Sequence, residues 1–219
     1  MNVNGLLRSS LFVCSLGLLS MPAGAATTRP VDSTLKVPLA PAAAAQKLAA
    51  VQREVRALAA AGKRPVAVFD IDDTLLHNGP FTPKALANTP EPGAVPFVRA
   101  LSAAGATIVY LTGRNTSELA KTTAALKDAG LPLGADAHLM LNPDRKVKTV
   151  DWKRSATPAI LKLGKPVAVF DNELANVRMF REAYPKSAVF RLATSSNKPD
   201  PGGNGPIFVI KDFLEAATR

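Results

Sequence analysis

Residues 66–74 read Val-Ala-Val-Phe-Asp-Ile-Asp-Asp-Thr, and this stretch decides the fold. Its first four residues form a continuous apolar run, which is typical of a strand buried on both faces of a parallel sheet. The polar residues Asp70 to Thr74 follow where that strand ends. In parallel sheets covered by helices, ligands bind at the carboxyl ends of the strands. The stretch therefore predicts both a buried strand and the position of a site.

Apolar strands and helical patterns alternate along the rest of the chain. The predicted strands are 66–69, 107–111, 138–141, 167–170 and 188–192, and a last element spans 207–217 after a turn-rich loop at 197–206. The predicted helices are 46–61, 95–104, 117–129, 152–163 and 173–183. This alternation favours an α/β fold, a Rossmann-like parallel sheet flanked by helices on both faces.

The first 25 residues have the layout of a secretory signal peptide. A positive region with Arg8 precedes an apolar run at 11–21, and small residues at 23–25 place the expected cleavage before Ala26. An apolar run of about 11 residues is shorter than the roughly 20 that a membrane-spanning helix needs. We therefore expect a periplasmic or secreted protein with no membrane span after cleavage. A flexible leader is expected at 26–45, followed by one folded domain at 46–219.

Charge and cysteine content narrow the function classes. The 219 residues include 27 Lys and Arg against 17 Asp and Glu, a net charge of +10. The signal segment holds one of the basic residues and none of the acidic ones, so the mature chain would carry +9. It also holds the one cysteine, Cys14, which excludes a disulfide scaffold and suits an oxidising compartment. The basic balance favours anionic partners such as phosphates, nucleic acid or acidic membrane surfaces.

Polar residues follow two further predicted strands. Thr112, Gly113 and Arg114 come after the second strand, and Asp171 comes after the fourth. Lys153 lies in the helix that leads into the fourth strand. Because the carboxyl ends of parallel strands meet at one edge, we expect these side chains to converge on the residues that follow 66–69.

Four segments resemble the signature segments of the haloacid dehalogenase (HAD) superfamily, and within it the small secreted acid-phosphatase-type members. They are 69–76 (FDIDDTLL), 109–114 (VYLTGR), Lys153 and 169–176 (VFDNELAN). The resemblance covers about residues 65–192 and implies a HAD-like core with a phosphoric monoester hydrolase activity. The alternative is a non-catalytic envelope module that binds phosphorylated or polyanionic ligands on the same core.

The resemblance also implies roles for individual residues. Asp70 is the expected nucleophile, which forms an aspartyl-phosphate, and Asp72 is the expected general acid and then general base. Phosphatases of the superfamily carry this second acid and dehalogenases do not. Its role needs a proton, so we expect Asp72 to be buried beside acidic neighbours. Thr112 is expected to bind the transferring phosphoryl group, with Lys153, or alternatively Lys148, as the phosphate lysine.

Charge balance predicts a metal ion. Asp70, Asp171 and a phosphate dianion bring about four negative charges together, and a single lysine offsets only one of them. A divalent cation is therefore expected, and carboxylate oxygens favour Mg²⁺. The expected ligands are the side chains of Asp70 and Asp171 and the backbone carbonyl of Asp72. Family members often carry a second acid in the last segment, where this chain has Asn172 and Asn176; whether either supports the metal stays open.

Five further residues near these motifs allow alternative roles. Thr74 is expected to pin the loop after the first strand, and Arg114 either contacts substrate or caps the following helix. His77 could line the entrance, His138 is expected in a strand, and Trp152 is expected to pack in the core.

The stretch 77–92 bears on specificity, because cap insertions give HAD enzymes their substrate selection. It is a Pro-rich loop rather than a domain, so we expect a minimal cap and an open site. An open, basic site suits a small phosphorylated substrate, a phosphorylated polymer, or closure by another subunit in an oligomer. The natural substrate and the choice between hydrolysis and phosphotransfer stay open.

Overall fold

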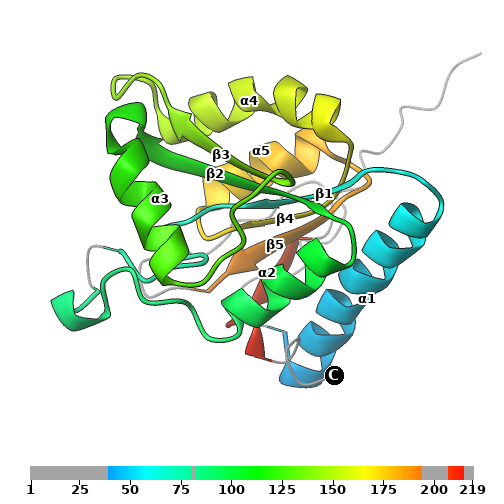
Figure 1. Ribbon diagram of the computed structural model, residues 1–219. Coiled ribbons are helices and arrows are strands. Elements are labelled where there is room, and N and C mark those ends of the chain that lie inside the picture. The colour runs from blue at the N-terminus through cyan, green and yellow to red at the C-terminus, as the bar shows by residue number, and fades with distance from the viewer. Residues whose placement is uncertain (1–38, 80–81, 194–206, 215–219) are drawn as a thin grey trace, which may run out of the picture. The chain divides into compact units, whose positions relative to one another are not determined.

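The computed structural model describes residues 39–79, 82–193 and 207–214, which all lie in the compact unit Asp32–Arg219. Figure 1 draws this part of the chain in colour. The predicted signal peptide, the predicted leader up to residue 38 and the predicted loop at 197–206 lie outside the described residues, as do residues 215–217 of the last predicted element.

The described residues form a six-stranded parallel sheet in the order β3-β2-β1-β4-β5-β6. Its strands are β1 (Pro65–Phe69), β2 (Thr107–Asn115), β3 (Ala137–Asn142), β4 (Lys165–Asp171), β5 (Ala188–Leu192) and β6 (Ile207–Ile210). All five residues of β1 are buried, as its apolar run predicts, and the strand lies between β2 and β4. The predicted α/β fold is confirmed.

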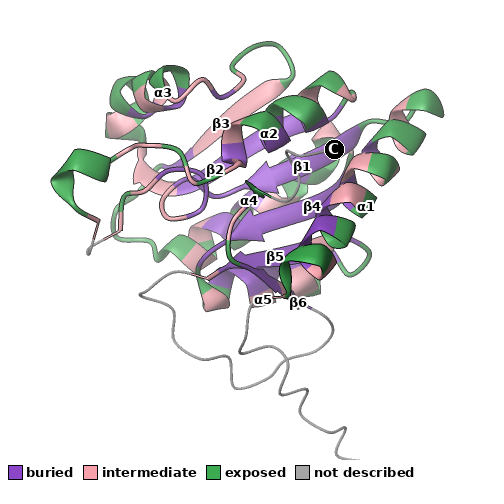
Figure 2. Cartoon of the chain, turned by 90° about the horizontal axis from the view of Figure 1, so that it is seen from below, coloured by how far each residue is buried: buried purple, intermediate pink, exposed green. Residues whose placement is uncertain are grey.

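Helices cover both faces of this sheet. They are α1 (Pro41–Ala60), α2 (Ala94–Ala103), α3 (Leu119–Asp128), α4 (Thr149–Leu163) and α5 (Leu174–Ala183), with short 3₁₀ turns η2 (Lys84–Leu86) and η3 (Thr116–Glu118). Helices α1 and α2 pack on one face, and α4 and α5 pack on the other (Figure 1). Figure 2 shows the buried strands between helices whose outer sides are exposed. None of the described helices combines the length and the apolar character that crossing a membrane requires.

Two predicted helix starts differ from the structure by three or more residues. Helix α1 begins at Pro41 rather than at residue 46, so residues 41–45 of the predicted leader are helical. Proline is favoured in the first helical turn, and Ala44 and Ala45 are buried there, which accounts for the earlier start. Helix α4 begins at Thr149 rather than at residue 152, so Lys153 lies in its second turn and does not open it.

Three stacked phenylalanines lie next to the carboxyl edge of the sheet. Phe69, Phe170 and Phe190 occupy matching positions on β1, β4 and β5, and adjacent rings stack with centroids 4.7 Å apart. All three are fully buried. Stacked aromatic rings of this kind contribute beyond their buried area, so they fix the spacing of the strands. The residues that follow Phe69 and Phe170 are Asp70 and Asp171.

Candidate active site

Strand register brings the polar segments to one edge of the sheet. Phe69 pairs with Tyr110 on β2 and with Phe170 on β4, so the residues after these positions emerge side by side. They include Asp70, Thr112 and Asp171, which are all buried. The backbone amide of Asp70 also donates a hydrogen bond to the carbonyl of Phe170 (2.9 Å), which extends the β1–β4 pairing by one residue.

Lys153 bridges two carboxylates at this edge. Its Nζ donates to Oδ1 of Asp70 at 2.5 Å and to Oδ2 of Asp171 at 2.7 Å. The three side chains come from α4, β1 and β4, and the lysine side chain is only 1% exposed. Two buried carboxylates with one ammonium leave an uncompensated negative charge, which costs desolvation free energy.

The pKa values of this cluster reflect burial and mutual charge. Burial is the main cause that raises the pKa of Asp70, to about 7; Lys153 opposes the shift, and Asp171 and Asp72 add to it. For Lys153, burial lowers the pKa, but the carboxylates of Asp171 and Asp70 outweigh it and raise the pKa to about 12. The ammonium is therefore held charged, and it cannot act as a proton donor near neutral pH.

Asp171 accepts hydrogen bonds on both oxygens. Besides Lys153, the backbone amide of Glu173 donates to its Oδ1 at 2.9 Å, and Asn176 Nδ2 donates to Oδ1 at 3.0 Å and to Oδ2 at 3.1 Å. Asn176 therefore fixes the orientation of this carboxylate. Asn172 is buried, and its carbonyl accepts from Nε of Arg191 at 3.1 Å.

Asp72 differs from the expectation that it is buried among acidic neighbours. Its side chain is 33% exposed and accepts from Arg114, through Nε at 3.1 Å and through Nη2 at 2.6 Å. Asn78 Nδ2 donates to the same carboxylate at 2.8 Å. Asp72 therefore lies at the rim of the site, where the guanidinium fork of Arg114 fits its carboxylate.

Arg114 does not cap the helical turn that follows it, which was one of its two expected roles. Asn115 caps the following helical turn instead, because its side chain accepts from the amide of Ser117 while Glu118 accepts from the amide of Asn115. Arg114 Nη2 also donates to Oδ1 of Asn88 (3.2 Å), so it joins Asp72 to the loop 77–92.

Sequence reasoning missed Asn78 and Asn88. Both lie in the loop 77–92, whose described part includes the short turn η2 and backbone hydrogen bonds between His77 and residues 88 and 89. Nothing in an Asn within a Pro-rich loop signals a partner on another element. Asn88 has a positive φ of 62°, a conformation that Asn tolerates better than most residues.

Thr112 lies where α4 meets β2. Its Oγ1 accepts from the backbone amide of Arg114 at 3.1 Å, and its carbonyl accepts from Nε1 of Trp152 at 3.0 Å. A Cβ added at Gly113 would lie 2.7 Å from Oγ1 of Thr149, so glycine is required for this close approach. The first turn of α4 therefore abuts the segment that carries Thr112. Trp152 is half-buried against the core, as expected, and in addition holds this segment.

Three other residues singled out in the sequence are Thr74, His77 and His138. Thr74 Oγ1 donates to Oδ2 of Asp70 at 3.3 Å, so it contacts the carboxylate directly. His77 Nδ1 lies 2.8 Å from Oε1 of Glu91 at the base of the loop 77–92. Burial, Asp73 and Asp212 raise the pKa of Glu91 to about 7. His138 lies in β3, as predicted.

The donor set at the edge fits a small divalent cation. Among the described residues, no group of three or more His, Cys, Asp and Glu side chains gathers as a ready-made metal cage. Asp70 and Asp171, however, already converge on one cationic atom, Nζ of Lys153. Mg²⁺ typically takes one or two carboxylates and completes its octahedron with waters and substrate phosphate. The two convergent carboxylates meet that requirement.

Comparisons with known proteins support the fold. No family model and no curated protein sequence matches the chain. Among solved structures, it is similar to the class C acid phosphatase from Bacillus anthracis (24% identity, 62% of this chain and 64% of that chain, TM-score 0.48) and to the same protein with tungstate bound (25%, 62%, 64%, 0.47). It is also similar to a chain of the Pnkp1/Rnl/Hen1 RNA repair complex (17%, 62%, 44%, 0.51), a likeness that shows a shared fold.

The alignment spans 64% of the length of the two acid phosphatase chains.

Proposed function

We propose that this chain is a secreted, Mg²⁺-dependent phosphatase that hydrolyses phosphate monoesters through an aspartyl-phosphate intermediate. The observation that carries the proposal is the buried cluster in which Lys153 bridges Asp70 and Asp171. An uneven number of buried charges is costly for a purely structural core. Strongly shifted pKa values with a named charge partner are typical of functional sites.

Asp70 and Asp171 supply the carboxylate oxygens of the proposed metal site, and the backbone carbonyl of Asp72 supplies a third protein oxygen. When bound there, Mg²⁺ would offset the negative charge of the phosphate dianion and polarise its oxygens. Asn176 orients Asp171 through two hydrogen bonds. The segment in which family members often carry a second acid has the neutral amides Asn172 and Asn176 here. We therefore expect weaker metal binding than a site with three carboxylates would give.

In the first half of the reaction, a carboxylate oxygen of Asp70 attacks phosphorus while the bond from phosphorus to the alcohol oxygen breaks. Lys153 and Thr74 hold the Asp70 carboxylate in one orientation. Asp72 gives its proton to the departing oxygen. The hydroxyl of Thr112 accepts from the Arg114 amide, which leaves its own hydrogen for a phosphoryl oxygen.

In the second half, the charged Asp72 accepts a proton from water. The water oxygen attacks phosphorus, the bond to Asp70 breaks, and inorganic phosphate leaves. Arg114 and Asn78 stabilise the carboxylate form of Asp72 that this step requires. An alcohol in place of water would give phosphotransfer by the same movements of atoms, so product analysis must accompany the phosphate assay.

The central test is an assay of the purified mature protein with p-nitrophenyl phosphate and Mg²⁺. We expect release of phosphate, its loss with EDTA, and a decrease of at least about a thousandfold in Asp70→Asn. Asp136→Asn, an exposed aspartate after α3, is the matched control and should keep full activity. Activity that survives Asp70→Asn, or that ignores EDTA, would overturn the proposal.

The same assay separates the alternative function. A non-catalytic module would bind phosphorylated ligands in a salt-sensitive manner and release no phosphate from about pH 4 to pH 8. Export is tested separately, by sequencing the amino terminus of the protein recovered from the periplasm or the medium. A mature chain that begins at Ala26 supports the predicted signal peptide, and an intact Met1 in the cytoplasm contradicts it.

A further inference from the structure

The run Arg145-Lys146-Val147-Lys148 is not used by the proposed mechanism. All four residues are exposed, and they follow β3 at the same edge of the sheet as Asp70 and Asp171. Within the described part of the chain, none of the three cations is in a salt bridge. A run of charges is often only a solvated surface, so its local structure and its position decide whether it could bind a ligand. We call these four residues the basic loop.

The basic loop is held in one conformation. Asn142 Nδ2 donates to the carbonyl of Val147 at 3.1 Å, and Asn142 Oδ1 accepts from the amide of Asp144 at 3.0 Å. Oδ1 of Asp144 in turn accepts from the amide of Lys146 at 2.9 Å. The loop therefore needs little ordering when a ligand binds, which lowers the entropic cost of binding.

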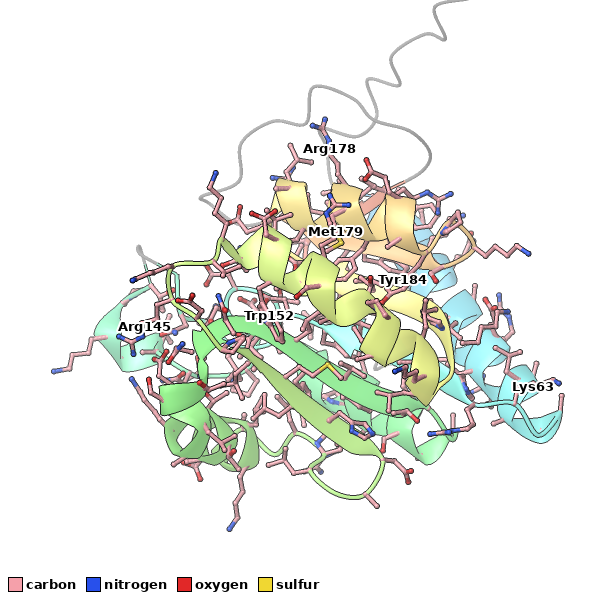
Figure 3. The ribbon with its side chains drawn as sticks, turned by 90° about the horizontal axis from the view of Figure 1, so that it is seen from above. Lys63, Arg145, Trp152, Arg178, Met179 and Tyr184 are labelled. Carbon is pink, nitrogen blue, oxygen red and sulfur yellow. The ribbon has the colours of Figure 1, made fainter. Side chains whose placement is uncertain are left out.

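Two contacts join the basic loop to the strand that carries Thr112. Asn115, three residues after Thr112, donates from Nδ2 to the carbonyl of Asn142 at 2.9 Å. Arg145 Nη2 donates to Oγ of Ser117 at 3.0 Å, which fixes the guanidinium at this end of the sheet (Figure 3). The remaining N–H groups of Arg145 have no hydrogen-bond partner among the described residues.

Of the three cations of the basic loop, Lys148 is the one whose chain neighbour contacts the segment that carries Thr112. It is the residue before α4, and the next residue, Thr149, abuts Gly113 beside Thr112. The start of α4 has no side-chain cap, so its free amides and the helix dipole add positive potential on the same side. Asp144 and Asp151 lie nearby in the chain and offset part of this positive potential.

We propose that the substrate is a small molecule with two phosphate groups, of which one is hydrolysed at Asp70 and the other is bound by Arg145, Lys146 and Lys148. This inference rests on the proposed function. A guanidinium with two ammonium groups offers charge-assisted hydrogen bonds that match a phosphate dianion. Three cations within four residues fit one further phosphate, whereas a polymer would call for a longer basic track.

The test compares fructose 1,6-bisphosphate with fructose 6-phosphate, which differ by one phosphate. We expect the wild-type kcat/KM to be about tenfold higher for the bisphosphate, because each exposed ion pair contributes a factor of a few. Replacing the three cations of the basic loop by alanine should remove this preference through KM. The activity on fructose 6-phosphate and on p-nitrophenyl phosphate should stay unchanged, because Lys153, and not the exposed Lys148, contacts Asp70 and Asp171. Added salt should lower the preference in the wild type.

The matched control replaces three exposed lysines at the other end of the sheet, Lys63, Lys127 and Lys162. Lys63 lies opposite Arg145 in Figure 3. The control lowers the net charge by the same amount and should keep the preference for the bisphosphate. An equal kcat/KM for the two sugars, or a loss of preference in both triple variants, would overturn the inference while leaving the phosphatase proposal intact. Inhibition by inorganic polyphosphate, lost in the loop variant and without any bisphosphate preference, would also overturn it and would indicate a polymeric ligand.

Discussion

Two carboxylate–cation contacts lie at one edge of the sheet, and they differ in how they are built. Asp70 and Asp171 contact Lys153 inside the core, where β1, β4 and α4 hold all three side chains. Asp72 contacts Arg114 at the rim, where its other partner comes from the loop 77–92. The buried contact is fixed by packing and carries a desolvation cost, while the rim contact is only partly buried, with Asp72 33% exposed.

This difference matches what the proposed reaction asks of each site. A nucleophile and metal ligands must keep their geometry through every step, and a rigid core provides that. A group that gives a proton and later accepts one must respond to a phosphate that arrives and leaves, and a rim position with exchangeable partners allows such a response. The predictions below test the two contacts against each other.

The largest effect is expected for Lys153→Met, which leaves two facing carboxylates without their cation. Removing one partner of a buried ion pair typically costs about 3–5 kcal/mol, so we expect a loss of that size in the free energy of unfolding, with no phosphatase activity. Urea denaturation with and without Mg²⁺ measures it, and Mg²⁺ should recover part of the loss by neutralising the same carboxylates. A loss below about 1 kcal/mol would show that the buried contact is not structural.

Asp72→Asn should have a smaller effect on stability than Lys153→Met and should act mainly on the activity. We expect a smaller change in the free energy of unfolding, about 1–2 kcal/mol, because the contact with Arg114 is only partly buried and asparagine keeps an acceptor oxygen for the guanidinium. Activity on an alkyl phosphate should fall by about 10²–10⁴-fold, since an alkoxide leaves poorly without a proton. The loss should be smaller for p-nitrophenyl phosphate, whose phenolate leaves unaided. Equal losses on both substrates would argue against Asp72 as the general acid.

Glu91 is a third carboxyl group to set beside those of Asp70 and Asp72. Among the described residues it has no lysine or arginine partner, and its contact is with His77. Its pKa is raised to about 7 from an ordinary value of 4.5, mainly by burial and then by Asp73 and Asp212. Between these two pH values the folded state binds more protons than the unfolded state, so stability falls as the pH rises.

Glu91→Gln should remove that decline. We expect wild type and variant to show the same pH dependence of stability below about pH 4.5, and the variant to gain on the order of 1 kcal/mol relative to wild type by pH 7 to 8. Thermal unfolding across this range measures the difference. Parallel curves for the two proteins would mean that Glu91 titrates normally in the folded state.

The sequence was most informative where the local pattern alone decides the structure. A fully apolar run followed by polar residues marked the ends of β1 and β4, and parallel pairing then places Asp70 beside Asp171. Helix starts were less predictable, because Pro41 and Thr149 begin α1 and α4 without a side-chain cap to mark them. The contact between Arg114 and Asp72 spans 42 residues of chain. No local pattern encodes a tertiary contact of that kind.

The most direct test of the account is to find where phosphate becomes attached. Wild-type protein mixed with substrate and Mg²⁺ is quenched in acid, digested, and analysed by mass spectrometry. We predict one phosphoryl group on the peptide that contains Asp70, absent after EDTA treatment and absent in Asp70→Asn. A phosphoryl group on another residue, or none while phosphate is released at the full rate and the acyl phosphate is shown to survive the quench, would contradict the account.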